Sequence, residues 1–190
     1  MTNFIGIYDN IMSEKSCNKI IDFFEESEYK HPGRLYKLNT LDHIEIDKKA
    51  KDSTDLYCSL YENECKDILF ALDKTTKEYI KDFPESNDGP SAWCLEERFN
   101  LQRYLPNQGY FSCHCENGNL DTSHRILAWM VYLNNVDDGG ETRFPSYDLN
   151  VKPRTGRVVI WPAFFTHMHH GITSKTETKY IATGWYVYRI

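Results

Sequence analysis

Residues 151–190 read VKPRTGRVVIWPAFFTHMHHGITSKTETKYIATGWYVYRI, and this stretch decides the class of fold. Branched and aromatic residues gather in short runs at 156–162 and 179–190, separated by turn-forming Gly, Pro, Ser and Thr. Such runs are typical of strands divided by turns. The stretch therefore predicts β structure.

The same pattern extends back to about residue 95. Eight short strands are predicted, at 95–105, 110–116, 125–134, 140–145, 149–153, 156–162, 166–171 and 179–190. Eight strands without helices between them are typical of a sandwich, a jelly roll or a barrel.

Helical patterns come before these strands. Ser13 is a candidate cap for a helix that runs to about Tyr29 and ends before the HPG turn at 31–33. A second helix is expected from Ser53 or Thr54 to Pro84, because apolar residues recur there at helical spacings: Leu56, Leu60, Ile68, Leu69, Leu72 and Tyr79. Residues 34–52 fit a loop or a short hairpin. The element order predicts a single α+β domain, mainly β, with a helical support segment at 1–94.

The net charge and the length of the apolar segments disfavour nucleic acid and membranes as partners. A formal charge of -6 gives no general attraction to nucleic acid, and no stretch approaches the length of a membrane span. The first twenty residues lack a basic start before a long apolar run, so we expect a cytoplasmic protein with reduced cysteines.

The segment YFSCHCENG (110–118) places His114 and Glu116 two positions apart. With 7 His and 28 acidic residues in 190 positions, about one such pair is expected by chance. His43 and Glu45 in DHIEI have the same spacing, without the strand context. The pair alone therefore identifies no site.

A second histidine cluster offers candidates for a third ligand. Strand alternation puts His167 and His169 on one face and His170 on the other. Either of the first two can complete a site with the earlier pair, since two imidazoles and one carboxylate are the ligands of non-haem Fe(II) oxygenases. Cys113 and Cys115 flank His114 but form no CxxC pair, which disfavours a closed zinc site.

Five blocks in order carry a resemblance to a known family: RYLPNQGYFSCHCE, AWMVYLNNV, GGETRFP, VKPRTGRVVIWP and HHGITSKTETKYIATGW. Over residues 95–190 the sequence resembles the 2-oxoglutarate and Fe(II)-dependent oxygenases, in their prolyl 4-hydroxylase-like branch. The resemblance implies a double-stranded β-helix, or jelly roll, as the catalytic core at 95–190. The GGETRFP block is at minimum a turn made by glycines.

In that family a histidine, an acid two positions later and a distal histidine bind iron, and a Lys or Arg about ten positions beyond binds the cosubstrate. The resemblance thus implies His114, Glu116 and His169 as catalytic iron ligands, with His167 the alternative distal ligand, and Lys179 for the far carboxylate of 2-oxoglutarate. Glu116 stands where the family more often has Asp, and an acid there disfavours halide binding. The resemblance also places four further side chains at the cosubstrate pocket: Tyr104, Tyr132, Thr183 and Trp185.

The implied reaction consumes 2-oxoglutarate and O2 and hydroxylates a substrate C–H bond, with succinate and CO2 as products. Ascorbate is a further candidate cofactor. The expected substrate is a proline-containing peptide or protein, and the nearest alternative is a free amino acid or small metabolite. A non-catalytic or cupin-like jelly-roll module is a third hypothesis, disfavoured because His114 and His169 lie 55 positions apart.

Overall fold

The computed structural model describes residues 2–36 and 44–189, so His43 lies outside the described residues. Its main feature is an eight-stranded antiparallel sheet in the order β1-β13-β10-β15-β8-β6-β2, with β7 also paired to β15. The strands of this sheet are β1 (Gly6–Tyr8), β2 (His31–Pro32), β6 (Thr54–Ser59), β7 (Trp93–Leu95), β8 (Arg98–Tyr104), β10 (Arg125–Tyr132), β13 (Val158–Pro162) and β15 (Lys179–Tyr188).

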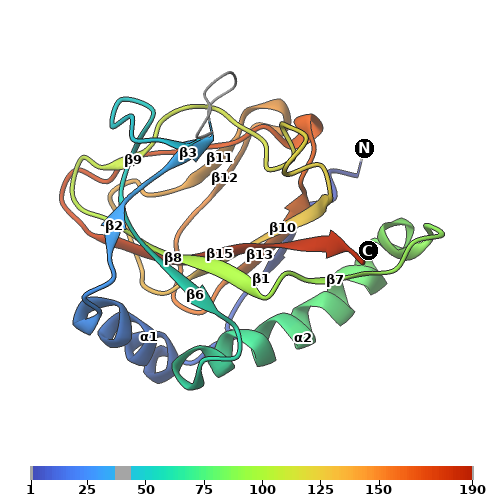
Figure 1. Cartoon of the computed structure of the whole chain (residues 1–190), viewed down its shortest axis with the longest axis horizontal. Coiled ribbons are helices and arrows are strands. Elements are labelled where there is room, and N and C mark those ends of the chain that lie inside the picture. Colours follow the sequence, from blue (N-terminus) through green and yellow to red (C-terminus); the bar gives the residue numbers. More distant parts are fainter. Residues whose placement is uncertain (1, 37–43, 190) are drawn as a thin grey trace.

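Smaller sheets cover one face of the large sheet, and two helices cover the other (Figure 1). The helices are α1 (Glu14–Glu26) and α2 (Lys66–Asp82). A three-stranded sheet is formed by β11 (Thr142–Phe144), β12 (Leu149–Val151) and β14 (His170–Gly171). Two hairpin-sized pairs are made by β3 (Leu35–Tyr36) with β4 (Ile44–Glu45) and by β5 (Lys51–Asp52) with β9 (Gly109–Tyr110). Short 3-10 turns occupy Asn63–Cys65, Pro84–Asn87, Pro145–Tyr147 and Phe165–His167.

The central strand β10 shows why the sheet lies between two cores. Leu127, Trp129 and Val131 pack into the core beneath the helices, whereas Ala128 and Met130 pack into the core between the sheets. Alternate side chains of a strand point to opposite faces, so a strand covered on both faces is apolar at every position. The arrangement confirms the predicted mainly β jelly roll with helices that support it.

The first helix is confirmed at its start. The Ser13 hydroxyl accepts a hydrogen bond from the Ser16 N–H at 3.1 Å, which caps α1. The buried residues Cys17, Ile20 and Phe24 form its inward face.

The predicted start of the second helix is wrong. Residues Thr54–Ser59 form β6, which pairs with β8 over its whole length, and α2 begins only at Lys66. Leu56 and Leu60, four positions apart, also fit a strand followed by a turn, so the spacing alone did not separate the two structures. The N-terminal half therefore adds β1, β2 and β6 to the main sheet as well as two helices, and the boundary at residue 94 stays a prediction.

Two predicted strands are much shorter than expected. Of the predicted strand 110–116 only Tyr110 belongs to a ladder, in β9, and of 166–171 only His170–Gly171 does. Both segments leave their strands near the histidines, where irregular backbone can aim side chains inward.

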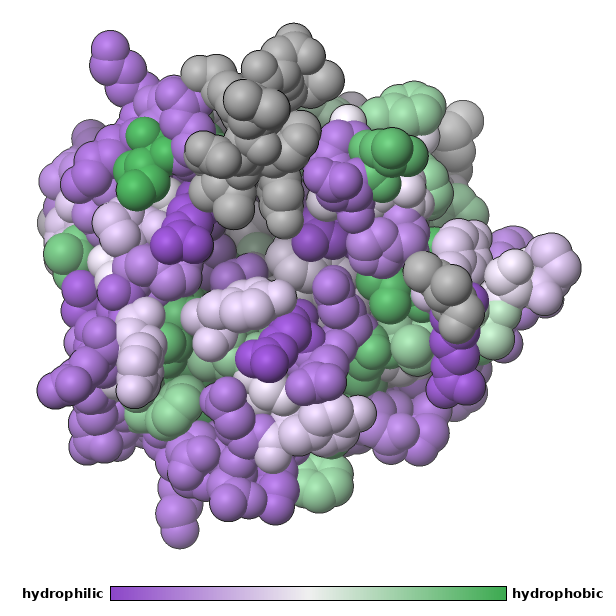
Figure 2. Space-filling view, viewed as in Figure 1, coloured by the Kyte–Doolittle hydropathy of each residue, from purple (hydrophilic) through white to green (hydrophobic). Residues whose placement is uncertain are grey.

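In the described ranges, neither helix is long and apolar enough to cross a bilayer. Hydrophilic residues dominate the face in Figure 2, with hydrophobic ones scattered among them.

Candidate metal centre and cosubstrate pocket

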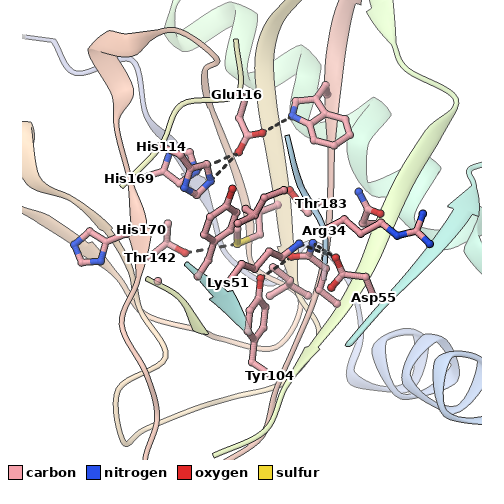
Figure 3. Close-up of a pocket in the computed structure, with 18 of the residues that line it drawn as sticks. Arg34, Lys51, Asp55, Tyr104, His114, Glu116, Thr142, His169, His170 and Thr183 are labelled. Atoms are coloured by element: carbon pink, nitrogen blue, oxygen red, sulfur yellow. Dashed lines mark hydrogen bonds and ion pairs between the residues drawn. The ribbon is translucent and has the colours of Figure 1, made fainter. Parts of the chain in front are cut away.

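Three side chains from two distant segments meet between the sheets (Figure 3). His114 and His169 form an isolated antiparallel bridge, in which each backbone N–H donates to the other residue's carbonyl at 2.9 Å. Oε1 of Glu116 lies 3.5 Å from Nε2 of His114 and 3.3 Å from Nε2 of His169. The bridge thus fixes two imidazoles around one carboxylate oxygen.

Hydrogen bonds at the far side of both rings set which nitrogen is free. Nδ1 of His114 lies 2.9 Å from the Ser112 carbonyl, and Nδ1 of His169 lies 2.9 Å from the His167 carbonyl. A carbonyl can only accept, so each Nδ1 carries the proton and each Nε2 keeps its lone pair. Both lone pairs face the Glu116 carboxylate, as metal ligands require.

The distances and charges fit a divalent metal. Metal–ligand bonds of about 2.1 Å put neighbouring ligand atoms about 3 Å apart, close to the separations observed. Burial alone would raise the pKa of Glu116, but the interactions with His114 and His169 outweigh it and hold that pKa well below its usual range. Burial, followed by the nearby His114, lowers the pKa of His169 and so favours a neutral ring. An anionic carboxylate and a neutral imidazole are the forms that bind a metal.

The other two histidines of the cluster lie apart from this group. His167 sits in the 3-10 turn rather than on a strand, with Nε2 2.8 Å from the Asn3 carbonyl and Nδ1 2.9 Å from the Thr166 hydroxyl. Both of its nitrogens are therefore occupied. The His170 ring points away from the three ligands (Figure 3). The structure thus brings His169, and not His167, to His114 and Glu116.

A cavity of about 460 Å³ opens beside these three candidate ligands, and Lys179 lies in its wall. The ammonium group of Lys179 is buried and donates to the Gly140 carbonyl at 3.0 Å. It also lies 4.9 Å from the Tyr104 ring centroid. No described carboxylate reaches salt-bridge distance of it, and burial lowers its pKa to about 8. An ammonium without a counter-ion in a cavity is suited to an anionic ligand.

Three of the four predicted pocket residues line this cavity: Tyr104, Thr183 and Trp185. The Tyr104 hydroxyl donates to the Gln102 side chain at 2.8 Å, so its proton is already committed inside the protein. Tyr132 lies in the core, where its hydroxyl donates to Thr142 at 2.7 Å. Thr142 itself lines the cavity, so Tyr132 supports the wall without forming it.

A buried ion pair in the same wall was not predicted. Nζ of Lys51 lies 2.6 Å from the Asp55 carboxylate, and Ser53 and Gln102 donate to the two oxygens of that carboxylate. Lys51 belongs to the charged run DKKAKDSTD, which reads as a solvated loop. Buried and half-buried residues alternate at 51–55 in the structure, but all five residues are polar, so the sequence held no signal of this burial.

A second group of ligand-type side chains lies away from the cavity. Ligand atoms of Cys58, Glu62 and Cys65 lie within 4.8 Å of one another. The hydrogen bond with Cys65 and then burial raise the pKa of the Cys58 thiol. Both thiols belong to the core beneath the helices, and protonated thiols are poor metal ligands. We interpret this pair as core packing.

Comparison with known proteins gives one consistent picture. The model of a family described as the 2OG-Fe(II) oxygenase superfamily matches residues 99–187. Prolyl 4-hydroxylase 13 of Arabidopsis thaliana is 25% identical over 209 residues, which cover 93% of this chain and 68% of that protein.

Two solved structures share the fold. The prolyl hydroxylase of Trichoplax adhaerens, solved with a hypoxia inducible factor peptide fragment, superposes with a TM-score of 0.75 and 18% identity, covering 98% of this chain and 84% of that one. The viral collagen prolyl hydroxylase of Paramecium Bursaria Chlorella virus-1, solved as a 2OG complex, gives a TM-score of 0.70 and 21% identity, covering 96% and 95%.

Proposed function

We propose that the chain is a member of the 2OG-Fe(II) oxygenase superfamily, on its prolyl 4-hydroxylase-like side, and that it hydroxylates prolyl residues in a peptide or protein substrate. We propose Fe(II) as the metal, 2-oxoglutarate as cosubstrate and O2 as oxidant. His114, Glu116 and His169 would hold the iron, and Lys179 would bind the far carboxylate of the cosubstrate.

The observation that carries the proposal is a pairing of two incomplete sites in one cavity. Three ligand atoms leave a metal with open positions, and a buried ammonium group in the same wall has no carboxylate partner among the described residues. A dicarboxylate with a keto group beside one carboxylate would supply both missing parts, because one end could bind the metal and the other would pair with the lysine.

The proposed reaction balances in atoms and electrons. One oxygen atom of O2 enters succinate while the other becomes the new hydroxyl group. Decarboxylation of 2-oxoglutarate to succinate and CO2 supplies two electrons, and the substrate C–H bond supplies two more. The protein side chains bind and orient the reactants and need not move a proton.

The binding test is an anaerobic titration of Fe(II) with 2-oxoglutarate, followed by the visible charge-transfer band of the chelate. The wild-type protein should develop the band, and His114→Ala and His169→Ala should not. Lys179→Met should need a far higher 2-oxoglutarate concentration, whereas Lys175→Met, at an exposed loop lysine nearby, is the matched control and should behave as wild type. A band of full strength in His169→Ala would refute the metal assignment.

The substrate test measures succinate and the product mass. Proline-containing peptides should stimulate succinate formation and gain one oxygen atom, with and without ascorbate in the assay. A free amino acid is the alternative substrate. Stimulation by free amino acids and not by peptides would favour that alternative and leave the chemistry unchanged.

A further inference from the structure

The two oxygens of the Glu116 carboxylate have different partners. Oε1 faces the two histidine Nε2 atoms, whereas Oε2 accepts a hydrogen bond from the Trp185 indole N–H at 2.8 Å. Only Oε1 is therefore directed to the place of the metal. The carboxylate is held for binding through one oxygen.

The Trp185 ring is itself held by Arg125. The guanidinium group of Arg125 lies 3.4 Å from the ring centroid, which is close stacking contact. Its Nη1 donates to the backbone carbonyl of Glu116 at 3.4 Å, and its Nε lies 4.0 Å from the Glu96 carboxylate. Arg125 thus bridges the backbone of Glu116 and the ring that holds its side chain.

A β-bulge brings Arg125 to this face. Across β10 and β15, Ala128 pairs with Trp185 and Leu127 with Tyr186, but the next pair is Arg125 with Val187. Ile126 is the extra residue, and it packs into the core beneath the helices together with Leu127. A regular ladder would have placed Arg125 opposite position 188, on the face away from the cavity.

We propose that Trp185 is a positioning residue which restricts Glu116 to one-oxygen coordination, and that Arg125, turned inward by the bulge, keeps the indole in place. The inference goes beyond the proposed function and rests on it only in requiring a divalent metal at His114, Glu116 and His169.

The physical reason lies in the number of open positions. A carboxylate that binds through both oxygens occupies two metal positions, and a chelating cosubstrate together with O2 needs three. Glutamate has one more rotatable bond than aspartate, so its free carboxylate is harder to hold in one orientation. The indole N–H removes that freedom by engaging Oε2.

Co(II) alone is the probe, because it binds such sites and its visible absorption reports the coordination number. Calorimetric titration of the apoprotein gives the affinity. Trp185→Phe keeps an aromatic ring and removes the N–H, and we expect Co(II) affinity to fall about tenfold, the loss typical of a hydrogen-bond partner of a metal ligand. The absorption spectrum should also change, as the released carboxylate binds through both oxygens.

A double-mutant cycle isolates the contact. In Glu116→Asp the shorter carboxylate cannot bind the metal and reach the indole together, so adding Trp185→Phe should change Co(II) affinity less than about twofold. Trp161→Phe is the matched control, since Trp161 packs 5.1 Å from the His169 ring and its buried N–H has no hydrogen-bond partner among the described residues. It should leave the Co(II) spectrum as in wild type.

The outcomes separate two failures. Wild-type protein that does not bind Co(II), or a His114→Ala protein that binds it equally well, would overturn the proposed metal site. Wild-type binding with an unchanged affinity and spectrum in Trp185→Phe would overturn only the positioning role. The positioning role would also be overturned if Trp185→Phe caused an equal loss with Glu116 intact and in the Glu116→Asp variant. Such a loss would show general destabilisation instead, and thermal unfolding of each apoprotein measures that directly.

Discussion

Two buried lysines lie in the wall of one cavity, and their surroundings are opposite. The two residues, Lys51 and Lys179, are 5% and 6% exposed, so water solvates neither ammonium group. Lys51 has the Asp55 carboxylate at 2.6 Å, whereas Lys179 has the Gly140 carbonyl at 3.0 Å and the face of the Tyr104 ring. Among the described residues the charge of Glu141 acts on Lys179 too, but outside salt-bridge distance. The contrast teaches that burial of a charge does not identify a binding group. The missing counter-ion does, because it leaves electrostatic attraction for a ligand.

The largest expected effect is on the paired lysine. Lys51→Met leaves Asp55 buried with its amide and hydroxyl donors but without a cation, and we expect the free energy of unfolding to fall by about 3 to 5 kcal/mol. Urea unfolding measures the loss. The double variant Lys51→Met with Asp55→Leu should recover most of it, because no buried charge remains. A Lys51→Met variant as stable as wild type would show that the Lys51–Asp55 pair does not stabilise the cavity wall.

Replacing the unpaired lysine, Lys179, is expected to change the free energy of unfolding in the opposite direction. Burial lowers the pKa of Lys179 from its usual value to about 8, so the ligand-free protein holds its charged form at a cost. Lys179→Met should raise the free energy of unfolding at pH 7 by about 2 to 3 kcal/mol. The same variant should lose the thermal stabilisation that 2-oxoglutarate with Co(II) gives to wild type. A Lys179→Met variant that is less stable than wild type and still protected by 2-oxoglutarate would contradict the claim that Lys179 lacks a partner and binds the cosubstrate.

The pH dependence of stability and of 2-oxoglutarate affinity gives a further test of Lys179. The unfolded chain holds the Lys179 proton up to about pH 10.5, and the folded chain loses it near pH 8, so this lysine makes stability rise with pH between these values. Its cost is fully present below pH 8. Affinity for 2-oxoglutarate should fall about tenfold per pH unit above pH 8, because binding then requires uptake of a proton. Calorimetry in buffers of different ionisation enthalpy measures the uptake, and Lys179→Arg, which stays charged, should show none in this range.

The smallest effect is expected at Tyr104, which connects the surroundings of Lys179 with those of Lys51. Its ring lies under Lys179, but its hydroxyl donates to Gln102, whose amide in turn donates to Asp55. Tyr104→Phe should lower the free energy of unfolding by about 1 kcal/mol and leave 2-oxoglutarate affinity within a few fold. Urea unfolding and the chelate titration check the two parts. A large loss of affinity with unchanged stability would assign the hydroxyl to the cosubstrate instead.

Parts of the site were predictable because they depend on short-range chemistry. His114 and Glu116 are two positions apart, and Lys179 lies ten positions beyond His169. Every second residue from 179 to 185 lies on the same face of one strand. The choice between His167 and His169 was not decided by alternation, since residues 165–167 form a 3-10 turn. Hydrogen bonds to Asn3 and Thr166 occupy His167, and Asn3 lies 164 positions away in the chain.

By itself, the sequence determined the mainly β class and the capped first helix, and it offered candidate ligand residues, because hydrophobic period and donor chemistry are local properties. Tertiary structure alone decided that Thr54–Ser59 is a strand, since its pairing with β8 outweighs an ambiguous spacing. It also decided that Lys51 meets Asp55 inside the cavity wall, and that a bulge at Ile126 turns Arg125 toward Trp185. Strand register and long-range pairing fix these contacts, and neither leaves a pattern in neighbouring residues.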